Sequence, residues 1–576
     1  MNHITSALPP KTHTPMYLMH KYWARKPHNI VNKYIKNYTK KGDIVLDPFC
    51  GSGVTALESL KLGRKAIAVD VDPMATFITR MTAIPINLKE FEKTFTSIKE
   101  NVEHKILSLY KTTCRKCKTQ VFATHVIWET KNDSEIPTTV WYTCPECKNN
   151  VYQKEKIKND DIKTLQKIKK MDIPNWYPDN DLIWNTRVNV HKGTKVSDLF
   201  TKRALIGLSI LLNEIEKITN DSLKSLMKFV FSGTLPQASK LVFVIQRRGR
   251  HSGKGKKTQE VGSWATRGYW VPPKHFEINV WNCFKNRFKK VLRGKKESNS
   301  LIKVYNEANK FEYLDNKNIF IKTANILNLT DFIPENSIDY IFTDPPYGDS
   351  IPYLELDYMW SSWLQFDPYF EDEIVISDSP ERNKHIEQYE TMLHKAFIQV
   401  FTVLKPGKFM TVTFHNTDIK MWNCIIRAAV LSGFSLEKII YQPPARPSPK
   451  GLLHPYGSAV GDYYIRFFKP KIKPFIAEPE LNKTKYEKIV VEIAKKLIAE
   501  RGEPIPYQYI LNGVIPELNN HGALLKGDKD IKEIMKDHLN DEFVLIDVKN
   551  DKGELIGHKW WLKDLSCISF LGKASG

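Results

Sequence analysis

One segment carries residue types suited to holding an amino group: Asp344-Pro345-Pro346-Tyr347. It follows residues 338–343, an apolar run that predicts a buried strand. Two consecutive prolines fix φ and remove two backbone donors, so the Pro345 carbonyl is left as an acceptor beside the Asp344 carboxylate. Two acceptors match the two hydrogens of an exocyclic amino group, and the Tyr347 ring offers a face for base stacking. A base inside a duplex reaches such a pocket only when it is flipped out. An ordinary proline-rich turn is the structural alternative.

A second segment has the residues of a nucleoside site: Asp47-Pro48-Phe49-Cys50-Gly51-Ser52-Gly53. Its glycines allow unusual dihedrals and close approach of a ligand to the backbone. The next predicted strand ends at Asp70, whose carboxylate can accept hydrogen bonds from both ribose hydroxyls. The segment lacks the GxGxxG that cradles a pyrophosphate and the GxxxxGK[ST] of a P-loop. It therefore predicts a nucleoside cofactor without pyrophosphate, for which S-adenosylmethionine is the natural candidate. A βα turn in another Rossmann-like protein is the alternative.

Alternating strands and helices must position both segments. Strand, glycine turn, helix and strand over residues 44–70 form one βαβ unit, which implies a parallel sheet with its ligand at the carboxyl ends of the strands. Further strands are predicted at 338–342, 408–414 and 463–468, and helices near 387–404 and 420–433.

These elements favour one Rossmann-like α/β domain that is split in the sequence. Its first half is residues 16–100 and its second half is residues 321–470, with residues 101–320 inserted between them. Residues 471–480 have the composition of a linker, and residues 481–576 are interpreted as a small winged-helix-like module.

Four cysteines have the spacing of a metal site. Two CxxC pairs, separated by 26 residues, can each present two thiolates on a tight turn: Cys114, Cys117, Cys144 and Cys147. Four thiolates complete a tetrahedral Zn²⁺ site and leave no open coordination position, so the metal would be structural. A redox pair or unliganded thiols are the alternatives.

The charge balance points to a polyanionic partner. The chain of 576 residues has 86 Lys and Arg against 64 Asp and Glu, a formal net charge of +22. With 42% hydrophobic and 26% charged residues it has the profile of a globular protein, which excludes a mostly disordered chain. No apolar run is long enough to span a membrane and no secretory signal is visible, so we expect a cytoplasmic protein with no membrane partner. The expected DNA-binding residues lie in and after one basic loop: Arg247, Arg248, Arg250, Lys254, Lys256, Lys257 and Arg267.

Together these motifs resemble the amino-group DNA methyltransferases, which methylate adenine N6 or cytosine N4. DPFCGSG is similar to the cofactor motif of that family, DPPY to its catalytic motif, and Lys26-Pro27 to a KP segment near the methionyl part of the cofactor. The resemblance covers roughly 16–85 and 320–470, and it implies that the inserted region recognises the target. The cofactor residues that it implies are Lys26, Pro27, Asp47, Pro48, Phe49, Gly51, Gly53 and Asp70, and the catalytic residues are Asp344, Pro345, Pro346 and Tyr347.

The resemblance predicts a sequence-specific methyltransferase that acts on duplex DNA by base flipping. Asp344 at the first catalytic position favours adenine N6, because Ser is frequent there in cytosine N4 relatives. Cytosine N4 and RNA remain alternative targets, and a catalytically silent, zinc-containing DNA-binding module is an alternative of another class. No nuclease motif stands out, so in a restriction-modification or phage-defence setting DNA cleavage would need a companion restriction endonuclease or other defence-system subunits.

Overall fold

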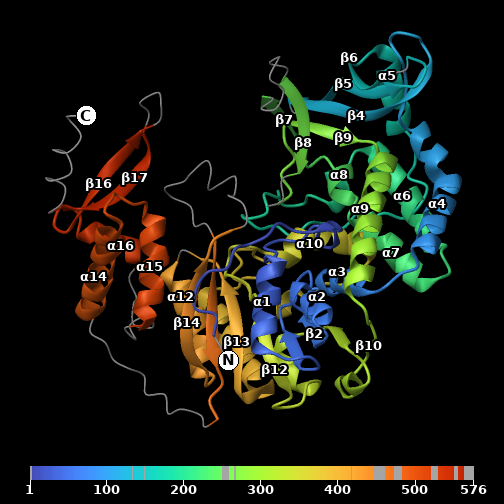
Figure 1. Ribbon diagram of the computed structural model, residues 1–576. Coiled ribbons are helices and arrows are strands. Elements are labelled where there is room, and N and C mark those ends of the chain that lie inside the picture. Colours follow the sequence, from blue (N-terminus) through green and yellow to red (C-terminus); the bar gives the residue numbers. More distant parts are fainter. Residues whose placement is uncertain are drawn as a thin grey trace.

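Two large sheets and a small C-terminal hairpin organise the chain (Figure 1). The computed structural model describes residues 3–132, 134–147, 149–248, 258–264, 268–416, 418–444, 461–471, 483–520, 530–549 and 555–563. No helix within these ranges is long and apolar enough to cross a membrane.

The main sheet has eight strands, and the first six in spatial order run parallel to one another. In spatial order they are β10 (Glu307–Ala308), β11 (Ile319–Thr323), β2 (Lys65–Asp70), β1 (Ile44–Asp47), β12 (Ile338–Thr343), β13 (Leu404–Phe414), β15 (Asp462–Phe468) and β14 (Ser435–Gln442). Only β15 runs antiparallel to both of its neighbours within this described sheet. The predicted α/β, Rossmann-like methyltransferase fold is thus confirmed.

Both faces of the main sheet are buried. Along β2, Ala66 and Ala68 belong to one hydrophobic core while Ile67 and Val69 belong to the other, as strand alternation requires. The first core includes residues of α1 (His28–Tyr38), α2 (Val54–Lys61) and α3 (Pro73–Ala83), and the second includes residues of α11 (Ile386–Val403) and α12 (Ile419–Leu431). This two-sided burial explains why the predicted strands read as continuous apolar runs.

The two edge strands β10 and β11 were not predicted. Both begin before residue 321, where the sequence places the second half of the core. β10 has two residues and β11 has five, and polar residues flank both, so neither gives a clear strand pattern. The main sheet therefore includes strands from the region assigned to the insertion.

The inserted region forms a helical layer and a second, antiparallel sheet. The helices are α4 (Leu88–Ser108), α6 (Lys202–Glu216), α7 (Asp221–Ser232) and α9 (Val280–Leu301), and they share the first core with the main sheet. The second sheet lies beyond these helices in Figure 1. Its strands are, in spatial order, β6 (Asn149–Lys156), β5 (Ser134–Cys144), β4 (Gln120–Lys131), β9 (Lys274–Ile278), β7 (Val242–Arg248) and β8 (Thr258–Trp264). A further short strand, β3 (Lys111–Thr113), pairs with β4. Two short helices, α5 (Asn159–Lys169) and α8 (Leu235–Ala238), complete the region.

The described part of the C-terminal segment contains three helices and a hairpin. They are α14 (Lys483–Arg501), α15 (Tyr507–Asn520), α16 (Ile531–Asp537), β16 (Phe543–Lys549) and β17 (Leu555–Leu562). The segment packs on the antiparallel edge of the main sheet, where the Tyr463 hydroxyl donates to Asn512 Oδ1 at 2.7 Å. The winged-helix interpretation of this segment stays a prediction.

Candidate functional site

The two sequence motifs meet at one edge of the main sheet. β1 and β12 are adjacent and parallel, with Leu46 opposite Ile341, so the glycine turn and the DPPY segment leave the sheet side by side. Thr343 at the end of β12 donates a 2.7 Å hydrogen bond to Asp47 at the end of β1, which ties the two motifs together. They border a cavity of about 890 Å³, including its opening to solvent. This is the carboxyl edge at which open α/β sheets bind ligands.

Two residues of the glycine turn adopt left-handed backbone conformations, which favour glycine. Gly51 has φ +47° and Gly53 has φ +77°, and a Cβ on Gly53 would lie 2.5 Å from Thr79. The Gly51 amide donates to Asp70 Oδ2 at 2.7 Å, and the Asp72 amide donates to Asp70 Oδ1 at 3.0 Å. Each carboxylate oxygen of Asp70 keeps a further lone pair, so the geometry permits the expected ribose contacts.

Six of the eight predicted cofactor residues border the cavity: Lys26, Asp47, Pro48, Phe49, Gly51 and Asp70. Pro27 does not, and instead precedes α1 as its N-cap residue. Gly53 likewise caps α2 and packs against Thr79.

Asp344 is held through one of its two carboxylate oxygens. Thr413 Oγ1 donates to Asp344 Oδ1 at 2.6 Å, the Tyr347 hydroxyl donates to the same oxygen, and Lys26 Nζ lies 3.3 Å away. Among the described residues none contacts Asp344 Oδ2, and none donates to the Pro345 carbonyl. One carboxylate oxygen and one main-chain carbonyl are therefore available to an amino group.

Tyr347 does not present an open face in this structure. Its side chain is buried, its ring meets Phe414 edge to face at 5.4 Å between centroids, and Lys26 Nζ lies 5.1 Å from its ring centroid. Asp344 and Pro346 border the cavity, whereas Pro345 and Tyr347 are not among the residues that line it. The stacking role of Tyr347 stays a prediction.

Lys26 lies on the side of the cavity that is formed by the DPPY segment. Its ammonium group donates to the Tyr347 hydroxyl at 2.5 Å and lies 3.2 Å from Asp462 Oδ1, in addition to its contact with Asp344. Burial alone would lower the pKa of Lys26, but Asp344 and Asp462 outweigh it and raise that pKa. The neighbouring Arg25 turns toward the glycine turn, where its Nε donates to Ser52 Oγ at 2.8 Å.

The cavity is acidic and partly desolvated. Burial raises the pKa of Asp47 to about 7, and burial together with the nearby Asp72 raises the pKa of Asp70 to about 8. Burial also raises the pKa of Asp344, although Lys26 opposes that shift. A cavity with this excess of carboxyl groups favours a positively charged ligand.

Several cavity residues were missed from the sequence. They are Tyr22, Arg25, Asp72, Tyr353 and Glu373. For the first two the signal was available, because the aromatic and cationic run Tyr-Trp-Ala-Arg directly precedes Lys26. Asp462, the partner of Lys26, was also missed, although it is a charged residue at the start of an otherwise apolar strand.

The four predicted cysteine ligands come together at one end of the second sheet. Their sulfur atoms all lie within 4.8 Å of one another, with Cys114 Sγ 3.8 Å from Cys147 Sγ and Cys117 Sγ 3.4 Å from Cys144 Sγ. Four sulfurs at this spacing are suited to a tetrahedral metal ion.

The predicted DNA-binding loop is described only at its edge. Arg247 and Arg248 are the last residues of β7, where they pair with Gln259 and Thr258 of β8. The other members of that set lie outside the described residues: Arg250, Lys254, Lys256, Lys257 and Arg267.

Comparison with known proteins gives short local matches. The chain is 40% identical over 52 residues to the type II methyltransferase M2.DpnII of Streptococcus pneumoniae, which is 9% of this chain and 19% of that protein. It is 38% identical over 71 residues to the ribosomal protein L11 methyltransferase of Campylobacter concisus, which is 12% of this chain and 25% of that protein. The chain thus spans a quarter or less of the length of these relatives. The solved structure of a DNA modification methylase from Thermus thermophilus, TTHA0409, matches with 16% identity over 30% of this chain and 61% of its own, at a TM-score of 0.16.

A family model gives the broader match. The model described as DNA methylase, of the N6 and N4 methyltransferases, matches residues 4–81 and 338–550, together about half of the chain. These two stretches include the glycine turn, Lys26, the DPPY segment and Asp462. The chain belongs to this DNA methylase family.

Proposed function

We propose that the protein transfers a methyl group from S-adenosylmethionine to the exocyclic amino group of a base in duplex DNA, with adenine N6 favoured. The observation that carries this proposal is Asp344, which borders the glycine-turn cavity and whose Oδ2 has no hydrogen-bond partner among the described residues. The adjoining Pro345 carbonyl likewise accepts no hydrogen bond from them. A flipped base that offers two amino hydrogens satisfies both acceptors.

The cavity residues fit S-adenosylmethionine. Its sulfonium and ammonium groups suit a cavity rich in carboxyl groups, and the remaining lone pairs of Asp70 suit its ribose hydroxyls. The residues that would hold it include Asp47, Phe49, Gly51 and Asp70. When bound, the cofactor supplies an electrophilic methyl group.

The chain contributes orientation and electrostatic stabilisation to the reaction. Asp344 Oδ2 and the Pro345 carbonyl hold the target amine and direct its lone pair toward the cofactor side of the cavity. Their hydrogen bonds strengthen as the nitrogen gains positive charge, which stabilises the transition state more than the ground state. No covalent intermediate with a protein side chain is required.

The product formed on DNA tests this proposal. We expect protein incubated with mixed-sequence duplex DNA and S-adenosylmethionine to form N6-methyladenine, measured by nucleoside mass spectrometry. N4-methylcytosine would keep the mechanism and change the target base. Cofactor binding without a methylated base in DNA or RNA would contradict the proposal and favour a silent DNA-binding module.

The setting we propose is DNA modification, alone or with a companion nuclease. It is supported by the family match and by the name of M2.DpnII, a type II methyltransferase. The inserted region, with β7 and β8 and their basic connection, is proposed to bind the DNA.

We further propose that the four-cysteine cluster holds a structural Zn²⁺. In Cys144→Ser we expect the loss of about one equivalent of bound metal and a lower melting temperature, because three thiolates hold zinc less tightly than four. Metal content is measured by mass spectrometry after purification without chelator. The matched control is Cys283→Ser, since Cys283 is a buried cysteine outside the cluster and should not change the metal content. Metal-free folded wild-type protein would contradict the assignment.

A further inference from the structure

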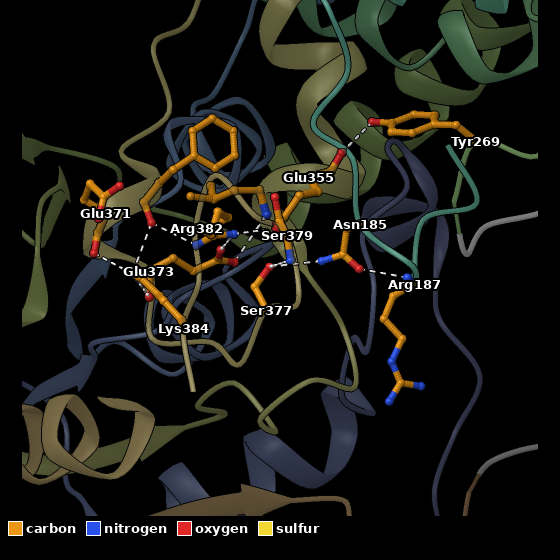
Figure 2. Close-up of polar contacts among 12 residues, drawn as sticks. Asn185, Arg187, Tyr269, Glu355, Glu371, Glu373, Ser377, Ser379, Arg382 and Lys384 are labelled. Atoms are coloured by element: carbon orange, nitrogen blue, oxygen red, sulfur yellow. Dashed lines mark hydrogen bonds and ion pairs between the residues drawn. The ribbon is translucent and has the colours of Figure 1, made fainter. Parts of the chain in front are cut away.

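The chain that follows Tyr347 forms a wall of the cavity and is fixed by a buried ion network (Figure 2). Arg382 pairs with Glu355 at 2.7 Å and with Glu373 at 2.6 Å, and the three side chains are at most 3% exposed. Lys384 Nζ donates to the carbonyl oxygens of Glu371 at 2.6 Å and Glu373 at 2.8 Å. Because buried charges are costly to separate, this wall has one favoured arrangement.

The wall comprises two neighbouring pieces of chain. One is the start of α10 (Tyr353–Leu364), where Tyr353 and Leu354 line the cavity. The other is residues 372–374, which also line it. Glu373 joins the two pieces, since it accepts a hydrogen bond from the Leu354 amide at 3.3 Å.

The inserted region contacts the chain on both sides of this wall. Asn185, which is 1% exposed, donates from Nδ2 to Ser377 Oγ at 3.2 Å, and Arg187 pairs with Asp349. Asp349 lies two residues after Tyr347. The residue before Ser377 donates its amide to the Gly348 carbonyl at 3.2 Å, next to the DPPY segment. Residues 185–187 therefore contact the chain just before the wall, at Asp349, and just after it, at Ser377.

Tyr269 forms a second contact between the inserted region and the wall, at α10. Its buried hydroxyl donates to the carbonyl of Glu355 or Leu356, at 2.8 and 2.9 Å, and accepts from the Met359 amide at 3.1 Å. The Tyr269 amide donates to the Val188 carbonyl at 2.7 Å, which joins residues 268–269 to residues 185–188.

This junction has almost no spare room. Gly268 has φ +117°, and a Cβ on it would lie 2.4 Å from the Val188 carbonyl oxygen. Residues 188 and 268 of the inserted region are therefore closely packed against each other, and only glycine fits at position 268.

The junction is close in sequence to the proposed DNA-binding hairpin. Tyr269 follows Trp264, the last residue of β8, by five positions. Trp264 also meets Trp360 of α10 edge to face, at 6.1 Å between ring centroids. Trp264 thus contacts α10 from the hairpin itself, and Tyr269 contacts the same helix five positions later in the chain.

We propose that Asn185 and Tyr269 are positioning residues that couple the β7–β8 hairpin to the cavity wall, so that DNA held by the inserted region sets the geometry of the target site. This inference rests on the proposed methyltransferase function. It does not require either side chain to touch DNA or cofactor. If the coupling is lost, we expect the rate of methyl transfer to fall more than the affinity for DNA or for S-adenosylmethionine.

The test compares two buried tyrosine hydroxyls. In Tyr269→Phe we expect kcat for methyl transfer to fall about tenfold, with KM for DNA and Kd for S-adenosylmethionine within about twofold of wild type, because small misplacements of reacting groups cost rate rather than affinity. The matched control is Tyr110→Phe, which removes a buried hydroxyl that accepts from the first amide of α9 inside the inserted region. We expect it to keep kcat while losing a similar amount of thermal stability.

A double-mutant cycle separates coupling from simple destabilisation. If Asn185 and Tyr269 act as one unit, Asn185→Ala added to Tyr269→Phe lowers kcat much less than the product of the two single effects. Unchanged kcat in Tyr269→Phe, or an equal fall in Tyr110→Phe, overturns the coupling while the proposed function stands. Absence of methyl transfer by the wild-type protein on any nucleic acid overturns both.

Discussion

Asp344→Ala is expected to lower methyl transfer by at least about a thousandfold while changing the affinity for S-adenosylmethionine by no more than about threefold. The substitution removes Oδ2, the side-chain acceptor that faces the proposed amine, and keeps the Pro345 carbonyl. The measurement is the single-turnover rate with labelled cofactor, together with cofactor affinity from calorimetry. Because the effect is on the bound complex, it should appear in kcat at saturating DNA.

Asp344 directly follows β12, and a second aspartate inside that strand allows a close comparison. Asp339 lies five residues earlier, in β12, and pairs with Lys405 at 2.9 Å and Lys408 at 3.3 Å. It also accepts a hydrogen bond from the Ile44 amide at 3.0 Å, far from the cavity end of the sheet. Asp339→Asn should lower stability and keep the transfer rate. Comparable rates in Asp344→Ala and Asp339→Asn would remove the basis for the catalytic assignment.

The sequence alone predicted the two motifs of the site, because each motif is one short, continuous stretch of chain. A glycine turn after an apolar strand has few alternatives, because Gly51 and Gly53 adopt conformations that other residues avoid. The DPPY segment is similarly constrained by its two prolines. The two segments lie 297 positions apart at Asp47 and Asp344, yet the parallel strands that precede them place both at one edge.

The parts that the sequence could not predict depend on contacts between distant segments. Nothing near Lys26 signals that Asp462 lies beside it, since β15 follows β14 in the chain but lies between β13 and β14 in the sheet. Likewise, Asn185 and Ser377 have no local pattern that marks them as partners. The short strand β11 was missed because its pairing with β2, rather than its own composition, makes it a strand. Long-range pairing overrides weak local preference in each case.

The ion cluster around Lys26 links two of these distant segments. Asp344 and Asp462 are two carboxylates on neighbouring parts of the sheet edge, and the Lys26 ammonium lies between them. Without a cation the two carboxylates would repel, and the pKa of Asp344 would rise further. Lys26 thus opposes the effect of burial on the pKa of Asp344 and favours the ionised carboxylate, the stronger hydrogen-bond acceptor.

Lys26→Met is therefore expected to lower kcat on the order of a hundredfold at neutral pH and to make that loss pH-dependent. The described groups around Asp344 are then Tyr347, Thr413, Asp47 and Asp462, none of which is a cation, and His415 Nδ1 lies 3.6 Å from Asp462 Oδ1. Removing the cation raises the pKa of Asp344 further above its usual value. The protonated carboxyl accepts hydrogen bonds poorly, so the acidic limb of the kcat profile moves to higher pH and activity is partly recovered as the pH rises.

A second buried lysine provides the control for this substitution. Lys295 on α9 donates to the main-chain carbonyls of Met81 at 3.0 Å and Thr82 at 3.3 Å, away from the carboxylates of the cavity. Burial lowers the pKa of Lys295 to about 7, so Lys295→Met removes a costly buried amine of the same size. We expect the pH dependence of kcat in Lys295→Met to be the same as in the wild-type protein. An unshifted acidic limb in Lys26→Met would show that the Lys26 ammonium does not govern the ionisation of Asp344. A parallel shift in Lys295→Met would instead assign the change to general destabilisation of the fold.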